Sequence, residues 1–215
     1  AEVKITEAAN AKSVSLGQGA TLSIESAGKL TLAAGGALHA SGDATVEVNA
    51  ADGLAFTTAT HIAVNPDKAL TLKRKAPGNI KGAGSLTLSG GGTLNVNLPL
   101  TTATGLEIKD GSTLNVVDTL PDLTGPAVTV TKGNLTLGYN LPAAVKRVEV
   151  TEGVLTVGQG RAIGNGSKTA PDGEVDLKDK GQLVLSGDLT LKELTTAEGS
   201  KITANGNVLT IIPTS

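Results

Sequence analysis

Residues 81–96 read KGAGSLTLSGGGTLNV, in which two apolar-x-apolar units, at 86–88 and 94–96, flank a run of glycines. Such a unit places two side chains on one face of an extended strand and one on the other, because successive side chains of a strand alternate. The same unit recurs every eight residues over 14–72. No window carries the 3.6-residue apolar period of a helix, so the pattern predicts many short strands joined by tight turns.

The units return at a longer period along the whole chain. After residue 100 they come in pairs that repeat about every 23 residues, with a third apolar position between pairs. Three short strands per repeat make one triangular coil of a parallel β-helix, in which neighbouring coils stack to bury their inner faces. The sequence therefore predicts an all-β solenoid of about nine coils of 20–27 residues, forming one domain over residues 1–215. The third apolar position recurs at Leu98, Leu120, Leu141 and Ile163.

Corresponding positions of successive coils are expected to stack in columns about 4.8 Å apart. The inner column of the first strand is expected to hold Ile62, Leu86, Leu106, Val128, Val148, Val175 and Ile202. The inner column of the second strand is expected to hold Leu22, Val46, Leu70, Leu94, Leu114, Leu135, Leu155, Leu183 and Leu209. Glycines between the paired strands are expected to supply the positive φ of sharp corners. An antiparallel β-sandwich is the competing architecture, although it does not require similar residues at this long spacing.

The outward residues of the second strand form an uncharged column. Short hydroxyl and amide side chains there could bind a glycan, order water or dock another protein at little cost in side-chain entropy. An ice-binding surface is disfavoured, because the pattern indicates one outward threonine per strand rather than two rows. The alternative is that these residues merely suit stacked strands. The expected column is Thr71, Asn95, Asn115, Thr136, Thr156, Val184 and Thr210.

The outward column of the first strand contains three acids. Glu149 and Asp176 are expected one coil apart and Glu107 two coils from Glu149, a separation that glycoside hydrolases use for paired carboxylates. On a flat exposed sheet the acids are equally expected to be simply solvated, since burial is what raises the pKa of an acid catalyst. The expected column is Ala63, Thr87, Glu107, Thr129, Glu149, Asp176 and Thr203.

A basic cluster falls in the first large loop, at Lys68, Lys73, Arg74, Lys75 and Lys81. It could bind a sulfated or acidic glycan, or it could keep strand edges apart. No aromatic residues lie between these charges, which disfavours single-stranded nucleic acid as a ligand.

Composition excludes several classes of function. The net charge of −2 gives no overall field to attract nucleic acid or an anionic membrane. With no cysteine and two histidines, the chain has no disulfides, thiol chemistry or Cys/His zinc site. We expect no cofactor, no metal and no catalytic residue.

The stretch 81–96, with its Gly-x-Gly-x-Leu-x-Leu-x-Gly pattern, resembles the repeats of autotransporter passenger domains and related bacterial surface adhesins. This resemblance implies a right-handed β-helix outside the cell that displays an adhesive or self-associating face. It covers most of the chain as periodicity but only these residues as a motif. No binding residue is transferred, because the family's binding positions follow no motif.

The expected protein is therefore an extracellular bacterial surface adhesin or adhesin stalk, a segment of a larger exported protein with flanking domains. Its expected partner is a host surface, a glycan or another copy of itself, bound through Thr71, Asn95, Asn115, Thr136 and Thr156 or through Lys73, Arg74 and Lys75. Two alternatives stay open: a polysaccharide-cleaving β-helix enzyme using Glu107, Glu149 and Asp176, and a spacer without a ligand.

Overall fold

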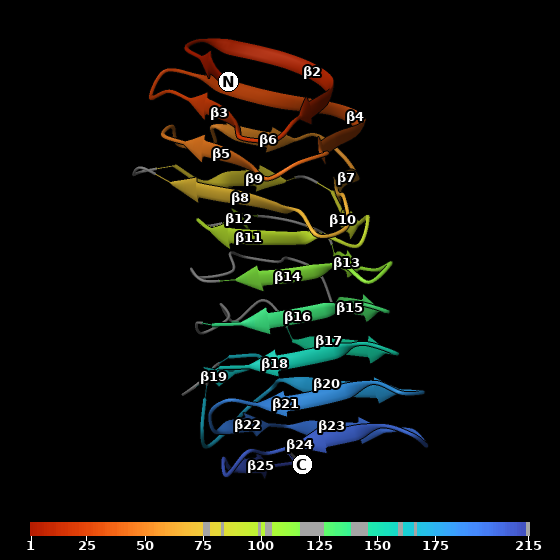
Figure 1. The fold of residues 1–215 in the computed structure, drawn as a ribbon. Helices are drawn as coiled ribbons and strands as arrows, with labels where there is room; N and C mark the ends of the chain where they lie inside the picture. The colour runs from red at the N-terminus through yellow and green to blue at the C-terminus, as the bar shows by residue number, and fades with distance from the viewer. Residues whose placement is uncertain are drawn as a thin grey trace.

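Parallel strands stacked along one axis make up the fold (Figure 1). The described residues contain no helix, and hence none long and apolar enough to cross a membrane. The computed structural model describes residues 1–74, 78–82, 84–98, 100–101, 105–116, 127–138, 146–158, 161–165 and 167–213.

Sheet A runs the full length of the stack and contains ten strands, each parallel to its neighbours. Every coil contributes one of them, which is why the sheet forms a continuous flat wall. In stacking order they are β1 (Glu2–Ile5), β3 (Ala20–Ile24), β5 (Ala44–Val48), β8 (Ala69–Arg74), β11 (Thr93–Asn97), β14 (Thr113–Val116), β16 (Asn134–Leu137), β18 (Val154–Val157), β21 (Gln182–Leu185) and β24 (Lys201–Thr203).

Sheet B has two branches that meet at the long strands β2 (Ala8–Leu16) and β4 (Lys29–Ala40). The first part of β4 pairs with a short branch: β6 (Leu54–Phe56), β9 (Ile80–Gly82) and β12 (Leu100–Thr101). Its second part pairs with a long branch: β7 (Thr60–Val64), β10 (Leu86–Ser89), β13 (Leu106–Ile108), β15 (Ala127–Thr131), β17 (Arg147–Thr151), β20 (Glu174–Lys178) and β23 (Glu193–Thr196).

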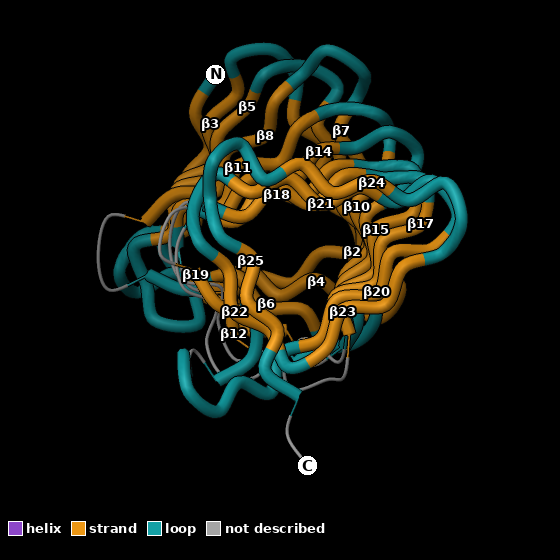
Figure 2. The backbone as a smooth tube through the Cα atoms, turned by 90° about the horizontal axis from the view of Figure 1, so that it is seen from below, coloured by secondary structure: helices purple, strands orange, loops and turns teal. Residues whose placement is uncertain are grey.

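Sheet C completes the third side of the lower coils with β19 (Arg161–Ala162), β22 (Leu189–Leu191) and β25 (Leu209–Ile211). Viewed along the axis, sheet A, the long branch, and the short branch with sheet C surround the interior on three sides (Figure 2). Each turn of the chain therefore visits three faces, as expected from three short strands per repeat.

The expected all-β parallel solenoid is confirmed, and the antiparallel sandwich is wrong, since every pairing among the described strands is parallel. Seven turns have all three faces within the described residues. This differs slightly from the expected count of about nine coils. Leu98 and Ile163, two of the expected third-strand positions, are buried, while Leu120 and Leu141 lie outside the described residues.

The interior is a single cluster of stacked aliphatic side chains running from Leu16 to Leu191, and Phe56 packs within it. Its most regular column lies on sheet A, where direct pairing joins one leucine per coil. Each coil cannot bury its own inner face, so the hydrophobic free energy of folding comes mainly from contacts between neighbouring coils. That column is Leu70, Leu94, Leu114, Leu135, Leu155 and Leu183.

Two expected pairings are wrong by two residues. Val46 pairs with Leu72 rather than with Leu70, and Ile62 pairs with Leu88 rather than with Leu86. A two-residue shift leaves every side chain on the same face of its strand, because the side-chain period of a strand is two. Alternation of apolar residues therefore could not distinguish the two registers.

The last coil is also assigned differently from expectation. Ile202 pairs with Leu183 in sheet A instead of following Val175, and Leu209 pairs with Leu189 in sheet C. Leu194 takes the position after Val175. The reason is coil length: only 19 residues separate the paired positions 184 and 203, fewer than the expected range.

The tight turns use their glycines in two ways. Gly111 and Gly206 have the expected positive φ, but at two other turns the residue before the glycine has it, Lys132 and Glu152 at 53° each. Gly153 is required for space instead, since a Cβ there would lie 2.6 Å from the carbonyl oxygen of Gly133 in the previous coil. The expectation of positive φ at that glycine is therefore wrong.

The backbone conformation of Glu152 predicts a stabilising substitution. Glu152→Gly is expected to be more stable to unfolding than Glu152→Ala by about 1 kcal/mol, because a left-handed conformation costs a non-glycine residue about that much. Both variants lose the ion pair of Glu152 with Lys132, 3.4 Å long, so their difference isolates the backbone. Urea unfolding of the two variants measures it, and equal stability would contradict the assignment.

Candidate functional site

A column of nine uncharged residues runs down the outer surface of sheet A. Direct pairing links each member to the next, and all are half-buried between their neighbours. Because the column sits on a continuous sheet, its side chains hold fixed positions about 4.8 Å apart. We call it the neutral column: Thr21, Thr45, Thr71, Asn95, Asn115, Thr136, Thr156, Val184 and Thr203.

The stacking expected from Thr71 to Val184 is confirmed. Thr210 is not a member, since it lies in sheet C beside Thr190, and Thr203 occupies the place expected for it. Sequence reasoning missed Thr21 and Thr45 because of the two-residue shift between β5 and β8. The signal was present: both follow an alanine and precede an aliphatic residue, as Thr71 follows and precedes a leucine.

A second outward column lies beside the neutral column, two residues earlier on each strand. Sheet A therefore presents two rows of side chains, not the single row expected. Across β11, β14 and β16 both rows consist of hydroxyl and amide groups, spaced about 6.7 Å along each strand and about 4.8 Å between strands. The second column is Thr93, Thr113, Asn134, Val154 and Gln182.

Amide groups bond along these columns from coil to coil. The Asn115 Nδ2 group donates to Asn95 Oδ1 at 3.0 Å, and Asn134 Nδ2 donates to Thr113 Oγ1 at 3.2 Å. These bonds fix the orientation of the amides, since an amide bonded along the stack has one preferred rotamer. The remaining donors and acceptors of these side chains are left for solvent or a ligand.

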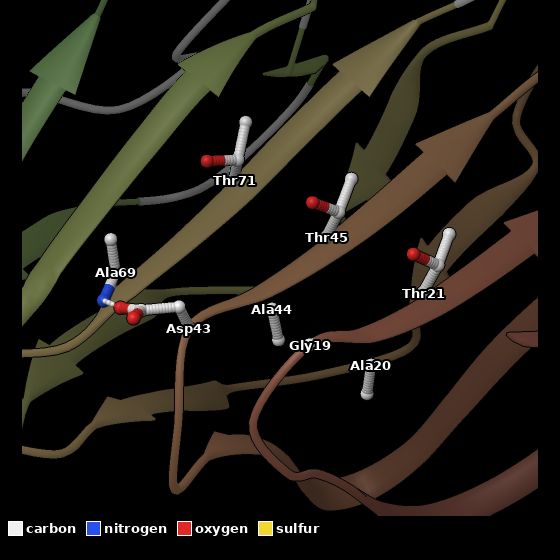
Figure 3. Close-up of a pocket in the computed structure, with 8 residues that line it drawn as sticks. All are labelled: Gly19, Ala20, Thr21, Asp43, Ala44, Thr45, Ala69 and Thr71. Atoms are coloured by element: carbon white, nitrogen blue, oxygen red, sulfur yellow. Dashed lines mark hydrogen bonds between the residues drawn. The ribbon is translucent and has the colours of Figure 1, made fainter. Parts of the chain in front are cut away.

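A shallow hollow of about 230 Å³ lies at the upper end of the neutral column. Figure 3 shows Thr21, Thr45 and Thr71 in a row along it, with their hydroxyl groups on the same side. The hollow forms because the adjacent lining residues Gly19 and Ala69 are small. Further down, threonine or asparagine occupies the position corresponding to Ala69, and the surface is flatter.

Asp43 stands at the rim of this hollow and ties three coils together. Its Oδ1 accepts from the backbone N–H of Ala69 at 2.9 Å and its Oδ2 from Gln18 Nε2 at 3.1 Å (Figure 3). These bonds favour the ionised carboxylate, so the pKa of Asp43 is lowered, chiefly by Gln18 and then by the Ala69 amide. Its oxygens are already engaged within the protein, so the threonines provide the accessible polar groups.

The acidic column lies on the long branch of sheet B. Glu149 pairs directly with Asp176, and Thr129 separates Glu149 from Glu107, as expected. Its ends differ from expectation for the same reasons of register: His61, not Ala63, lies beside Thr87, and Thr195, not Thr203, follows Asp176.

Each of these three acids lies close to a basic group. Arg147 contacts Asp176 at 2.8 Å and Glu149 at 3.7 Å, and Lys178 contacts Glu149 at 2.7 Å. The bond to Asp176 raises the pKa of Arg147. Sequence reasoning missed these cations, although both lie two residues from an acid and hence on its face. The acidic column is therefore an ion-pair network at the surface, worth about 0–1 kcal/mol per exposed pair.

Glu107, the third acid, has Lys109 at 3.9 Å. It also accepts a hydrogen bond from the Thr87 hydroxyl at 3.5 Å. The expected pair of unneutralised carboxylates is therefore not present among Glu107, Glu149 and Asp176.

The basic cluster expected in the first large loop is divided between two sheets. Lys73 lies on sheet A and pairs with Glu47 at 2.7 Å, whereas Lys81 lies on the short branch of sheet B and pairs with Asp52 at 3.2 Å. Arg74 ends β8, opposite Val48, and also has an interaction partner. Lys75 lies outside the described residues. The described members thus do not gather into one basic patch.

Comparisons of this chain with protein-family models, with curated proteins and with solved structures found no match. The site is therefore assessed on its own geometry: a flat, uncharged double row on sheet A, and an ion-paired acidic column on sheet B.

Proposed function

We propose that this chain is an extracellular solenoid of a bacterial surface, which attaches to a glycan or host surface through the neutral column of sheet A. The observation that carries the proposal is the unbroken run of uncharged side chains from Thr21 to Thr203. The chain acts as the adhesin itself or as part of its stalk.

The chemistry of this face suits a polymer rich in hydroxyl groups. Threonine and asparagine side chains offer both donors and acceptors, and their short length limits the entropy lost when they bind. The sheet holds them in place beforehand, which reduces the ordering cost of association. One hydrogen bond contributes only about 0.5–1.5 kcal/mol net, so useful affinity requires a ligand that engages several coils.

A second polar group supports attachment at the upper end of the column. The hollow beside Thr21, Thr45 and Thr71 has room for part of a sugar ring next to three parallel hydroxyls. No charged side chain belongs to the neutral column itself, so binding there is expected to depend little on ionic strength.

A glycan and host-matrix array tests the proposal. The purified chain is expected to bind selectively, and Thr136→Lys/Thr156→Lys is expected to lose at least about tenfold in affinity, the equivalent of 1.4 kcal/mol. Two long cations in adjacent coils would block the column and repel each other. Thermal unfolding of each variant confirms that it is folded.

A matched control places the same two substitutions on another face. Thr129→Lys/Thr195→Lys alters outward threonines of the long branch of sheet B. This control is expected to bind like the unmodified chain. Equal loss in both variants, or no binding by the unmodified chain at micromolar concentration, would refute attachment through sheet A.

An alternative role, polysaccharide cleavage by Glu107, Glu149 and Asp176, is less well supported. An acid catalyst needs its protonated form stabilised, and the neighbouring Arg147 and Lys178 favour ionised carboxylates instead. The proposal therefore expects Glu149→Gln to leave glycan binding unchanged.

A further inference from the structure

The large apolar residues that are exposed among the described residues all lie at the two ends of the solenoid. Val3 is 56% exposed in the first coil, and Ile202, Val208 and Ile211 are 41%, 58% and 40% exposed in the last. Figure 1 shows the corresponding strands β1, β24 and β25 at opposite ends of the stack. The side walls between them expose no comparable apolar patch in the described part of the chain.

These residues occupy core positions that lack a neighbouring coil. Val3 continues the column of Leu22, and Ile202 continues that of Leu183. Ile211 likewise continues the column of Leu191. Burial of such a side chain contributes about 1.5–3 kcal/mol, so covering each end with a further coil would be strongly favourable.

The strands at both ends also have an unpaired edge in the described structure. At one end these are β1 and β2, and at the other β23, β24 and β25. Strand edges of this kind present free N–H and C=O groups that pair readily with another chain. The two ends expose opposite edges of the same parallel stack, so the edge at one end fits the edge at the other.

The two ends also match in register, because two outward columns run unbroken from end to end. One leads from Glu2 through the neutral column to Thr203, and the other from Ser13 to Thr195. If a second copy continued both columns, its Glu2 would follow Thr203 and its Ser13 would follow Thr195. On the third side, sheet C lies below the short branch that begins at β2 (Figure 2).

Charges at the two ends are complementary in that register. Glu193 precedes Thr195 by two residues, and Lys12 directly precedes Ser13, so the carboxylate of one copy would lie beside the ammonium of the next. Lys201 would lie diagonal to Glu2, within reach of a long side chain. Glu193, Lys12 and Lys201 are all exposed.

We propose that copies of this chain stack end to end, the last coil of one against the first coil of the next, continuing the parallel sheets. The interface is head-to-tail and does not close on itself, so it generates filaments that grow with concentration. This assembly is independent of the proposed attachment through sheet A, since it leaves that face uncovered.

Sedimentation velocity with end-blocked variants tests the proposal. The unmodified chain is expected to form a ladder of oligomers that lengthens from low to high micromolar concentration. Val3→Lys blocks the first coil, and Ile202→Lys/Ile211→Lys blocks the last, so each variant alone is expected to be monomeric. An equimolar mixture is expected to form dimers and nothing longer, because it contains one intact end of each kind.

Several outcomes would overturn the proposal: a monomeric unmodified chain, dimers of either blocked variant alone, or a mixture that stays monomeric. The substituted positions are already exposed, and circular dichroism checks that the variants fold. Glu193→Lys provides a milder test, expected to weaken assembly, with recovery on mixing with Lys12→Glu. Thr136→Lys/Thr156→Lys is expected to assemble normally, so loss of glycan binding and loss of stacking are distinguishable.

Discussion

Leu155→Ala is expected to lower the free energy of unfolding by about 2–5 kcal/mol, the usual cost of a cavity at a fully buried leucine. Leu155 is 0% exposed and lies between Leu135 and Leu183 in the sheet A column. The cavity therefore weakens two coil interfaces at once. Urea denaturation followed by circular dichroism gives the change.

The control is the next residue on the same strand. Thr156→Ala alters the outer face of β18 and is expected to change the free energy of unfolding by no more than about 0.5 kcal/mol. In a solenoid stabilised by nearest-neighbour contacts, Leu155→Ala is also expected to broaden the transition. Similar costs for the two substitutions would contradict the assignment of inner and outer faces.

Gly78→Ala is expected to be comparably damaging for a different reason. A Cβ at this position would lie 1.8 Å from the carbonyl oxygen of Val48 in the preceding coil, and backbone atoms cannot move aside as a flexible side chain can. We expect a loss of about 3 kcal/mol or more, in the range of severe core and backbone substitutions. Thermal unfolding measures the loss.

Gly17→Ala provides the matched comparison for Gly78→Ala. Nothing lies within 4 Å of a Cβ at Gly17, and its φ is not positive. This substitution is expected to be neutral or to stabilise the fold by about 0.4–1 kcal/mol, because alanine restricts the unfolded chain. A large loss at both positions would show that close approach of the coils is not the cause.

The architecture was predictable because two sequence periods agree. The apolar-x-apolar units define strands, and their return after 20 to 28 residues requires similar side chains to stack, as Leu94, Leu114 and Leu135 do. An antiparallel sandwich could satisfy the first period but has no need of the second.

Register was less predictable than architecture. The pairing of Val46 with Leu72 instead of Leu70 preserves inside and outside, so no hydrophobic pattern distinguishes the two. The final coil differs because a 19-residue turn is shorter than the others, which moved Ile202 from the first strand of a coil to the second.

The candidate site was partly predictable for the same reason. The stack from Thr71 to Thr156 follows from alternation alone, whereas Thr21, Thr45 and the second row depend on the register of β5 against β8. The neutralisation of Glu149 by Lys178 depends on contacts between coils 28 residues apart in sequence or more, which spacing within one strand does not reveal.

The central claim is that a single register runs through the whole chain and carries both the neutral column and the matching ends. Spin labels on cysteine pairs test it directly, since the chain contains no native cysteine. From Thr45, labels at Thr136, Thr156 and Thr203 lie four, five and seven strands away in sheet A. At strand spacing the backbone separations are expected to be about 19, 24 and 34 Å, rising with strand number. Electron-electron distance measurements that rise in this order support the account, and a Thr203 label no farther from Thr45 than the Thr136 label would contradict it.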